Sequence, residues 1–132
     1  MKKERVFDLE ERLIDFSVVI LQLAKSMSGT YEGKYFAGQI VRLGSSAALN
    51  YGEAQAAESR KDFVHKSRIV LKELRETLVN VKIIPRAELL RDPGLILEKV
   101  QSERNALISI FVKCIQTAEK NTQLKTNNKA RL

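Results

Sequence analysis

The chain has 132 residues, enough for one domain, and 44% of them are hydrophobic, enough to bury a core. A single cysteine, Cys114, excludes an intramolecular disulfide. The longest strongly apolar run, residues 16–24, is too short to span a membrane. With only two prolines and six glycines, the composition predicts an all-α, cytoplasmic protein without a membrane anchor.

The net charge of +7 is concentrated near the carboxyl end. Four cations and no acid follow Glu119, namely Lys120, Lys125, Lys129 and Arg131. The hydrophobic periodicity ends near Asn121, so we predict a disordered basic tail over residues 122–132. Such an excess is typical of proteins that neutralise phosphates of a nucleic acid, and also of soluble bundles with a lysine-rich tail.

The first predicted helix covers about residues 4–28. Apolar residues recur at alternating spacings of three and four, at Val6, Leu9, Leu13, Phe16, Ile20, Leu23 and Met27. A second stripe beside them consists of Phe7, Ile14, Val18 and Leu21. Gly29 follows at the expected end and is predicted to form a left-handed helix cap.

The second predicted helix, about residues 34–57, has an unusual composition. Only Arg42 and Glu53 are charged between residues 35 and 57. One face carries Phe36, Ile40, Gly44, Ala47, Tyr51 and Ala54, and the opposite face carries Gly38, Ser45, Leu49 and Ala56. A helix that is apolar or small nearly all round is usually buried nearly all round. We therefore expect its own bundle to cover one face and another subunit to cover the other.

Two further helices are predicted, over about residues 60–83 and 93–120. Ser59 is the expected N-cap of the third, and Ile84-Pro85 its expected end. Its inward positions are Phe63, Ser67, Val70, Leu71, Leu74, Leu78 and Val81, with Ile69 and Val79 off this stripe. The fourth carries Leu97, Val100, Leu107, Phe111, Cys114 and Ala118. Short connections force antiparallel neighbours, so residues 1–121 predict one up-down-up-down four-helix bundle.

The residues that could carry chemistry are few. His65, the only histidine, stands three residues after Asp62, a spacing that di-iron bundles use with glutamate. Such a site needs two of these motifs and inward carboxylates, whereas His65 is predicted to point outward. Cys114 falls on the inward stripe and is interpreted as a buried structural thiol. We therefore predict a non-enzyme without metal, cofactor or small-molecule substrate.

A polar edge follows one flank of the second helix, between its two apolar faces. It consists of Gln39, Arg42, Ser46, Asn50 and Glu53. Polar side chains beside a buried helix need hydrogen-bond partners. They are interpreted as bonding across helices or subunits and fixing register, with a groove that contacts a ligand or RNA as the alternative.

Two motifs resemble one known family. The first, in the second predicted helix, consists of Gly38-Gln39-Ile40-Val41-Arg42, Ser46 and Asn50-Tyr51-Gly52-Glu53-Ala54. The second, in the third predicted helix, consists of Lys61-Asp62-Phe63 and Leu71-Lys72-Glu73-Leu74-Arg75-Glu76-Thr77. They are similar to the S23-type four-helix-bundle proteins, named for open reading frames in intervening sequences of bacterial large-subunit ribosomal RNA. The chain departs from the usual pattern at Tyr51 and Gly52, where the family more often has an aliphatic residue and alanine.

The resemblance implies a four-helix bundle that assembles as a ring-shaped homopentamer, with no established enzymatic activity. A distant branch comprises the accessory variability proteins of retroelements, which bind a reverse transcriptase and nucleic acid. Our first hypothesis is an oligomeric bundle associated with RNA or an RNA-related partner. Its candidate nucleic-acid contacts are Arg60, Lys61, Lys66, Arg68, Lys120, Lys125, Lys129 and Arg131. The alternative is a protein-interaction scaffold without nucleic-acid binding.

Overall fold

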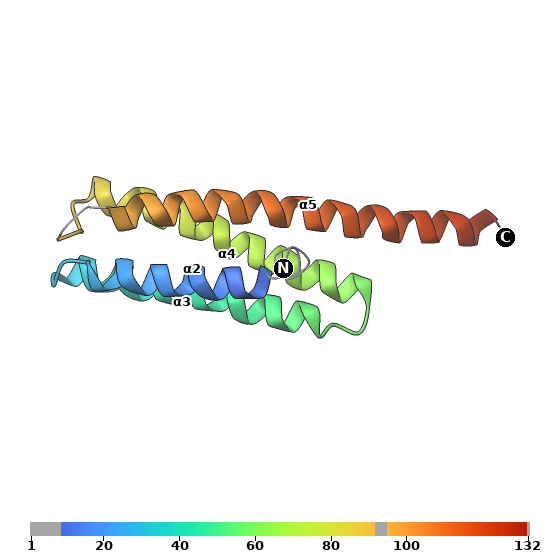
Figure 1. Cartoon of the computed structure of the whole chain (residues 1–132), viewed down its shortest axis with the longest axis horizontal. Coiled ribbons are helices and arrows are strands. Elements are labelled where there is room, and N and C mark those ends of the chain that lie inside the picture. Colours follow the sequence, from blue (N-terminus) through green and yellow to red (C-terminus); the bar gives the residue numbers. More distant parts are fainter. Residues whose placement is uncertain (1–8, 92–94, 132) are drawn as a thin grey trace, which may run out of the picture.

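The structure, a computed structural model, describes residues 9–91 and 95–131, and the burial of side chains in residues 9–91 and 96–121. Its elements are α2 (Leu9–Lys25), α3 (Tyr31–Gln55), α4 (Arg60–Arg86) and α5 (Leu95–Arg131). The helices lie side by side as a long bundle (Figure 1). No strand occurs in the described ranges, so the all-α prediction is confirmed.

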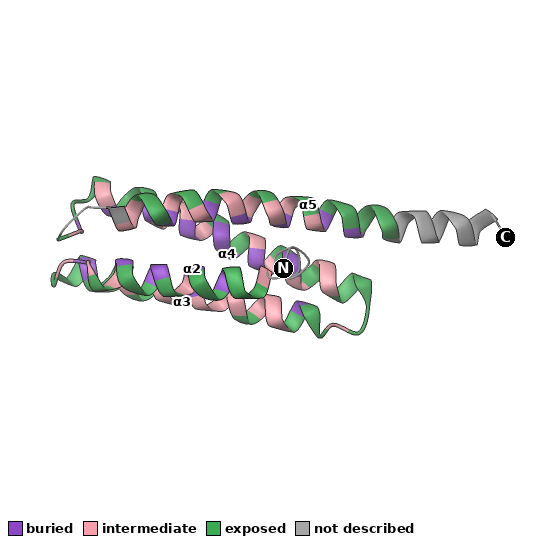
Figure 2. Ribbon diagram, viewed as in Figure 1, coloured by how far each residue is buried: buried purple, intermediate pink, exposed green. Residues whose placement is uncertain are grey.

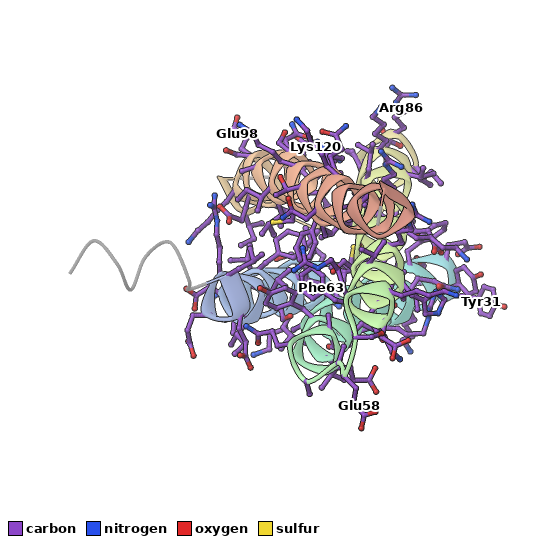
Figure 3. All side chains as sticks on the ribbon, turned by 90° about the vertical axis from the view of Figure 1, so that its right-hand side faces the viewer. Tyr31, Glu58, Phe63, Arg86, Glu98 and Lys120 are labelled. Atoms are coloured by element: carbon purple, nitrogen blue, oxygen red, sulfur yellow. The ribbon has the colours of Figure 1, made fainter. Side chains whose placement is uncertain are left out.

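Each helix packs against two others. α3 packs against α2 and α4, and α5 packs against the same two helices from the other side. Consecutive helices run in opposite directions, which confirms the up-down-up-down bundle (Figure 1). The view along the bundle shows α2 and α4 at opposite corners, with Tyr31 and Arg86 pointing outward (Figure 3). The outer faces of α2 and α4 therefore point away from each other.

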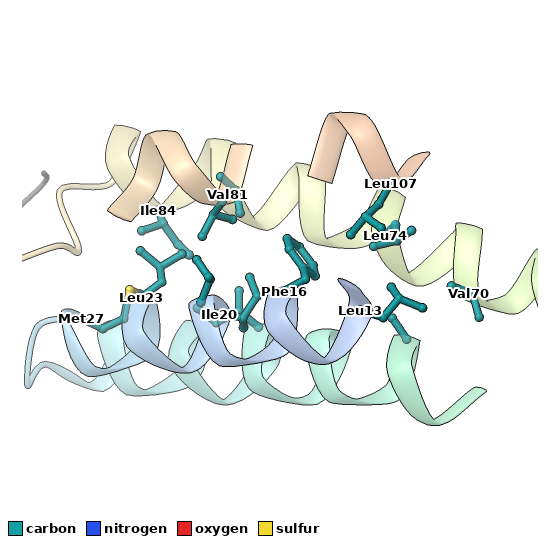
Figure 4. Packing of buried hydrophobic residues seen from close by; sticks show 14 of the residues in the cluster. Leu13, Phe16, Ile20, Leu23, Met27, Val70, Leu74, Val81, Ile84 and Leu107 are labelled. Carbon is teal, nitrogen blue, oxygen red and sulfur yellow. The ribbon is translucent and has the colours of Figure 1, made fainter. Parts of the chain in front are cut away.

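The hydrophobic core lies along the centre of the bundle. Leu13, Phe16, Ile20 and Leu23 of α2 face residues of α4 and α5 such as Leu107 (Figure 4). Buried residues line the facing sides of the helices and exposed residues their outer sides (Figure 2). Removing these side chains from water stabilises the fold at roughly 25 cal/mol per Å² of apolar area. The periodic stripes of the sequence thus predicted the core of α2 correctly.

The inward face of α4 differs in part from the prediction. Phe63, Leu71 and Leu78 are only half-buried, whereas Glu73 and Thr77 are buried. A straight helix turns 100° per residue, which places positions 70, 73, 74, 77, 81 and 84 on one face. Burial of a glutamate in this set requires a hydrogen-bond partner on a neighbouring helix.

The connection between α2 and α3 corrects one predicted cap. No glycine in the described chain has a positive φ, so Gly29 is not a left-handed cap. Instead the backbone N–H of Ser28 donates to Leu89 O at 2.6 Å, and that of Arg91 donates to Ser26 O at 2.8 Å. The turn is therefore held by the segment that follows α4. The predicted start of the first helix, residues 4–8, lies outside the described residues.

The two middle helices begin at capping hydroxyls. Thr30 accepts a hydrogen bond from the backbone N–H of Gly33 at 3.1 Å, so α3 begins at Tyr31, three residues before the predicted start. Ser59 accepts from the N–H of Asp62 at 3.1 Å, which confirms the predicted N-cap of α4. Both caps satisfy backbone donors that a helix leaves unpaired in its first turn.

The ends of α4 and α5 lie beyond their predicted positions. Pro85 lies in the last turn of α4, which continues to Arg86, because a proline so close to the end removes few helical hydrogen bonds. α5 continues to Arg131, where we expected a disordered tail from residue 122. Neither glycine nor proline occurs between residues 95 and 131, and extending a helix needs no new nucleus. Residues 93–94 of the predicted fourth helix lie outside the described residues.

Candidate interaction surfaces

The polar edge of α3 divides into two parts. Near the start of α3, Gln39 Nε2 donates to Tyr35 Oη at 2.9 Å, and Arg42 Nη2 donates to Gln39 Oε1 at 3.2 Å. These three side chains form an exposed chain of hydrogen bonds along one helix. Ser46 lies half-buried between the two parts, and no side-chain hydrogen bond from it to another described residue is present. This first part joins no helices.

The second part of the polar edge connects α3 to α4. Asn50 Nδ2 donates to Glu73 Oε1 at 2.9 Å, and Lys66 Nζ lies 3.1 Å from Glu53 Oε2. Glu73 is 8% exposed, so its carboxylate depends on the Asn50 amide, while the Glu53–Lys66 pair is largely exposed and stabilises little. Asn50 therefore connects α3 to α4, as the interpretation of the polar edge expects. Sequence reasoning missed Glu73, although its spacing from Val70 and Thr77 placed it inward.

Replacing Asn50 by leucine is expected to lower the free energy of unfolding by about 1–3 kcal/mol, because the buried Glu73 carboxylate loses its donor. Chemical unfolding at a fixed protein concentration measures this change. The double variant Asn50→Leu/Glu73→Met should recover most of the loss, since it removes the stranded carboxylate as well. A double variant as unstable as Asn50→Leu would contradict the assigned role of this pair.

Most of the predicted nucleic-acid contacts lie at one end of the bundle. The antiparallel packing places the start of α4, with Arg60 and Lys61, beside the second half of α5, where Lys120 lies, and all three side chains are exposed. Beyond Lys120, α5 projects past the other helices (Figure 1). The projecting part carries Lys125, Lys129 and Arg131, whose side chains lie outside the described set.

The other two predicted contacts are engaged within the bundle. Lys66 pairs with Glu53 of α3, and Arg68 pairs with Glu119 of α5. Both pairs are exposed, so they add little to the stability of the fold. Each carboxylate nevertheless offsets a positive charge that would otherwise attract a phosphate group. Among the predicted nucleic-acid contacts, those at the end of the bundle are therefore the ones that no described carboxylate engages.

Large apolar side chains remain exposed on three helices. On α3, Tyr31 is 80% and Leu49 is 72% exposed. The others are Ile14, Val18 and Leu21 on α2, Tyr35 on α3, and Val79 and Ile83 on α4. Cβ atoms built at Gly38 and Gly52 of α3 would meet no other atom within 4 Å. The second apolar face predicted for this helix is thus uncovered in the single chain.

Arg104 is buried in the bundle without a carboxylate partner among the described residues. It is 5% exposed, and its Nη2 donates to the neighbouring Asn105 Oδ1 at 2.6 Å. Its Nε and Nη1 are buried and have no hydrogen-bond partner. Burial lowers the pKa of the guanidinium, because a charged group is less stable away from water. No sequence pattern predicts this burial, since a lone arginine in a helix is normally solvated.

The residues considered for catalysis are not assembled into a site. Cys114 is half-buried at the edge of a groove of about 780 Å³ rather than in the core, where Ile115 lies instead. Burial raises the pKa of this thiol, which disfavours the reactive thiolate. His65 is exposed, and within the described ranges no three His, Cys, Asp or Glu side chains are grouped to hold a metal ion. No helix in these ranges is long and apolar enough to cross a membrane.

Comparison with known proteins relates the chain to a solved structure. No family model and no curated protein matches the chain. Among solved structures, the chain is similar to a protein with unknown function from the S23 ribosomal protein family of Bacteroides thetaiotaomicron VPI-5482, determined at 1.70 Å resolution. The two share 27% sequence identity and superpose with a TM-score of 0.72, over 80% of this chain and 96% of the other. The helix signatures and the bundle agree with this similarity, so the chain resembles the S23 ribosomal protein family in both sequence and fold.

Proposed function

We propose that the protein is a cytoplasmic, non-enzymatic bundle that self-associates and binds RNA through the basic end formed by α4 and α5. The observation that carries this proposal is the position of the free cations. Arg60, Lys61 and Lys120 lie exposed at the end from which α5 projects, and no acid follows Glu119 on that projection. A helix that presents cations away from the bundle can reach phosphates without displacing packed residues.

Self-association is supported by the exposed apolar residues. Leu49 and Tyr31 are among the most exposed large apolar side chains, and the outer face of α3 offers no charged residue besides Arg42 between residues 35 and 52. Several large exposed apolar side chains on one helix are typical of protein–protein interfaces. A ring of five subunits is the arrangement that the family resemblance implies.

The RNA proposal predicts a change in the salt dependence of binding. Replacing Lys120, Lys125, Lys129 and Arg131 by glutamine should make the slope of log K against log salt shallower by about 3, because each phosphate contact to a single strand contributes about 0.7. Fluorescence anisotropy with a labelled single-stranded RNA between low and moderate salt measures this slope.

A matched control neutralises four cations at the opposite end of the bundle. Lys25, Lys34, Arg86 and Arg91 are exposed there, and their replacement by glutamine changes the net charge by the same amount. This control should keep the wild-type slope. If both variants lose slope equally, the binding follows net charge and the basic end has no special role. If the wild type does not bind RNA, the proposal fails.

A protein scaffold without RNA binding is the second candidate. It is favoured by the ion pairs of Lys66 and Arg68, which offset the charge along the middle of α4. In that case the wild-type protein associates with itself in sedimentation velocity but carries no nucleic acid at low salt. Absorbance at 260 and 280 nm across the sedimenting boundary distinguishes the two candidates.

A further inference from the structure

The outer face of α2 combines an apolar stripe with acidic neighbours. Ile14, Val18 and Leu21 are 41%, 47% and 42% exposed and recur at spacings of four and three. Glu11 and Asp15 flank this stripe in the first half of the helix and are exposed. Neither carboxylate makes an ion pair with another described residue. This face is therefore both apolar and negatively charged.

The outer face of α4 has the opposite charge. Val79 and Ile83 are 55% and 38% exposed, and Lys72 and Arg75 lie exposed before them along the helix. Glu76 is half-buried beside them, so this set of side chains keeps a net positive charge. No ion pair with a described residue engages either cation. A groove of about 620 Å³ follows the seam between α4 and α5, and Leu71 lies on its wall. The two outer faces are thus complementary in charge, and both expose aliphatic side chains.

The two faces also match in height along the bundle. Ser17 Oγ donates to Gly44 O at 2.9 Å, which places these residues of α2 and α3 level with each other. Asn50, six residues after Gly44 on α3, is likewise level with Glu73 of α4. Because α3 and α4 are antiparallel, Gly44 is level with the residue six positions after Glu73, which is Val79.

It follows that Ser17 of α2 is level with Val79 of α4. Val18, the next residue, is at nearly the same height as Val79. Glu11, six positions before Ser17, is at the height of Glu73 and therefore close in height to Lys72. α2 and α4 run in the same direction, since both are antiparallel to α3. In a cyclic assembly whose axis is parallel to the helices, residues that are level within one copy are also level between neighbours.

We propose that the outer face of α2 packs on the outer face of α4 of a second copy, in a head-to-tail contact. In this contact Val18 and Leu21 of one copy meet Val79 and Ile83 of the other. The acids on the outer face of α2 lie opposite Lys72 and Arg75. The inference rests on the proposed self-association and names the surfaces that produce it. The two faces differ, so each copy keeps one of each free and the contact continues until a ring closes.

Ring closure with α3 on the inner side would account for the composition of that helix. α3 packs against both α2 and α4. In a ring that has α3 on its inner side, the outer faces of α3 from neighbouring copies therefore approach each other. Gly38 and Gly52 leave open space on this face, which permits close approach of helices. Leu49, 72% exposed in one chain, would then be covered.

Charge reversal tests the contact. The variants Glu11→Lys/Asp15→Lys and Lys72→Glu/Arg75→Glu are each expected to weaken self-association on the order of tenfold or more, because like charges then face each other. The fourfold variant, with both faces reversed, should regain wild-type association. Sedimentation velocity over a range of protein concentrations measures the association, and circular dichroism verifies that each variant is folded.

A control reverses Lys113, an exposed cation of α5 outside the proposed contact, and should associate like the wild type. Val18→Ser, which leaves every charge in place, should weaken association as well. If the wild type associates and neither charge-reversed face alters it, or the fourfold variant fails to recover, the proposed contact is wrong although self-association stands. A monomeric wild type overturns the self-association itself.

Discussion

Replacing Phe111 by alanine is expected to lower the free energy of unfolding by about 3–5 kcal/mol. Phe111 is 0% exposed in the centre of the core, and its ring meets Tyr51 of α3 edge to face, with centroids 5.4 Å apart at 88°. Truncation removes both this contact and the packing against α2 and α4. It leaves a cavity that straight helices cannot close without shifting as whole bodies.

Urea unfolding followed by circular dichroism measures this loss, at one protein concentration because self-association would add to the apparent stability. Lys113→Ala is a suitable control, since Lys113 lies on the same helix as Phe111 but is exposed. Its replacement should change the unfolding free energy by at most about 0.5 kcal/mol. A Phe111→Ala variant as stable as this control would show that the helices around Phe111 are not packed as described.

Replacing Arg104 by methionine is expected to raise the free energy of unfolding, by about 1–4 kcal/mol. Arg104 is 5% exposed, and two of its three guanidinium nitrogens, Nε and Nη1, make no hydrogen bond to a described residue. Moving such a charge out of water costs free energy that the single bond to Asn105 does not offset. Methionine has a similar length and fills the same space without a charge.

The matched control for Arg104 is Arg12→Met. Arg12 lies exposed on α2 and pairs with Glu103 of α5, so its replacement should lower stability by at most about 1 kcal/mol. Both variants are compared by chemical unfolding at the same protein concentration. If Arg104→Met is less stable than the wild type, Arg104 has an anionic partner in the folded assembly, and the description of its charge as uncompensated is wrong.

Sequence patterns predicted the architecture because they depend on local geometry. The spacing of Leu13, Phe16, Ile20 and Leu23 reports one helix face directly, and short connections leave antiparallel packing as the available arrangement. Ser59 could be identified as a cap because its role involves only the next three residues. Helix ends were predicted less well. Gly29 is in the sequence position that favours a left-handed helix cap. The turn after α2 is instead held by backbone hydrogen bonds to Leu89 and Arg91, far along the chain.

The sequence by itself determined a four-helix bundle, its core stripes and an α3 with two apolar faces, since each follows from the period of the helix and the chemistry of neighbouring residues. Only the tertiary structure decided which polar groups are paired and which are alone. Glu73 accepts a hydrogen bond from Asn50, Arg104 has no anionic partner in the described part of the chain, and Lys66 and Arg68 are engaged by carboxylates. These outcomes depend on which helices meet and at what height, and contacts between residues 13 to 51 positions apart leave no periodic trace in the sequence.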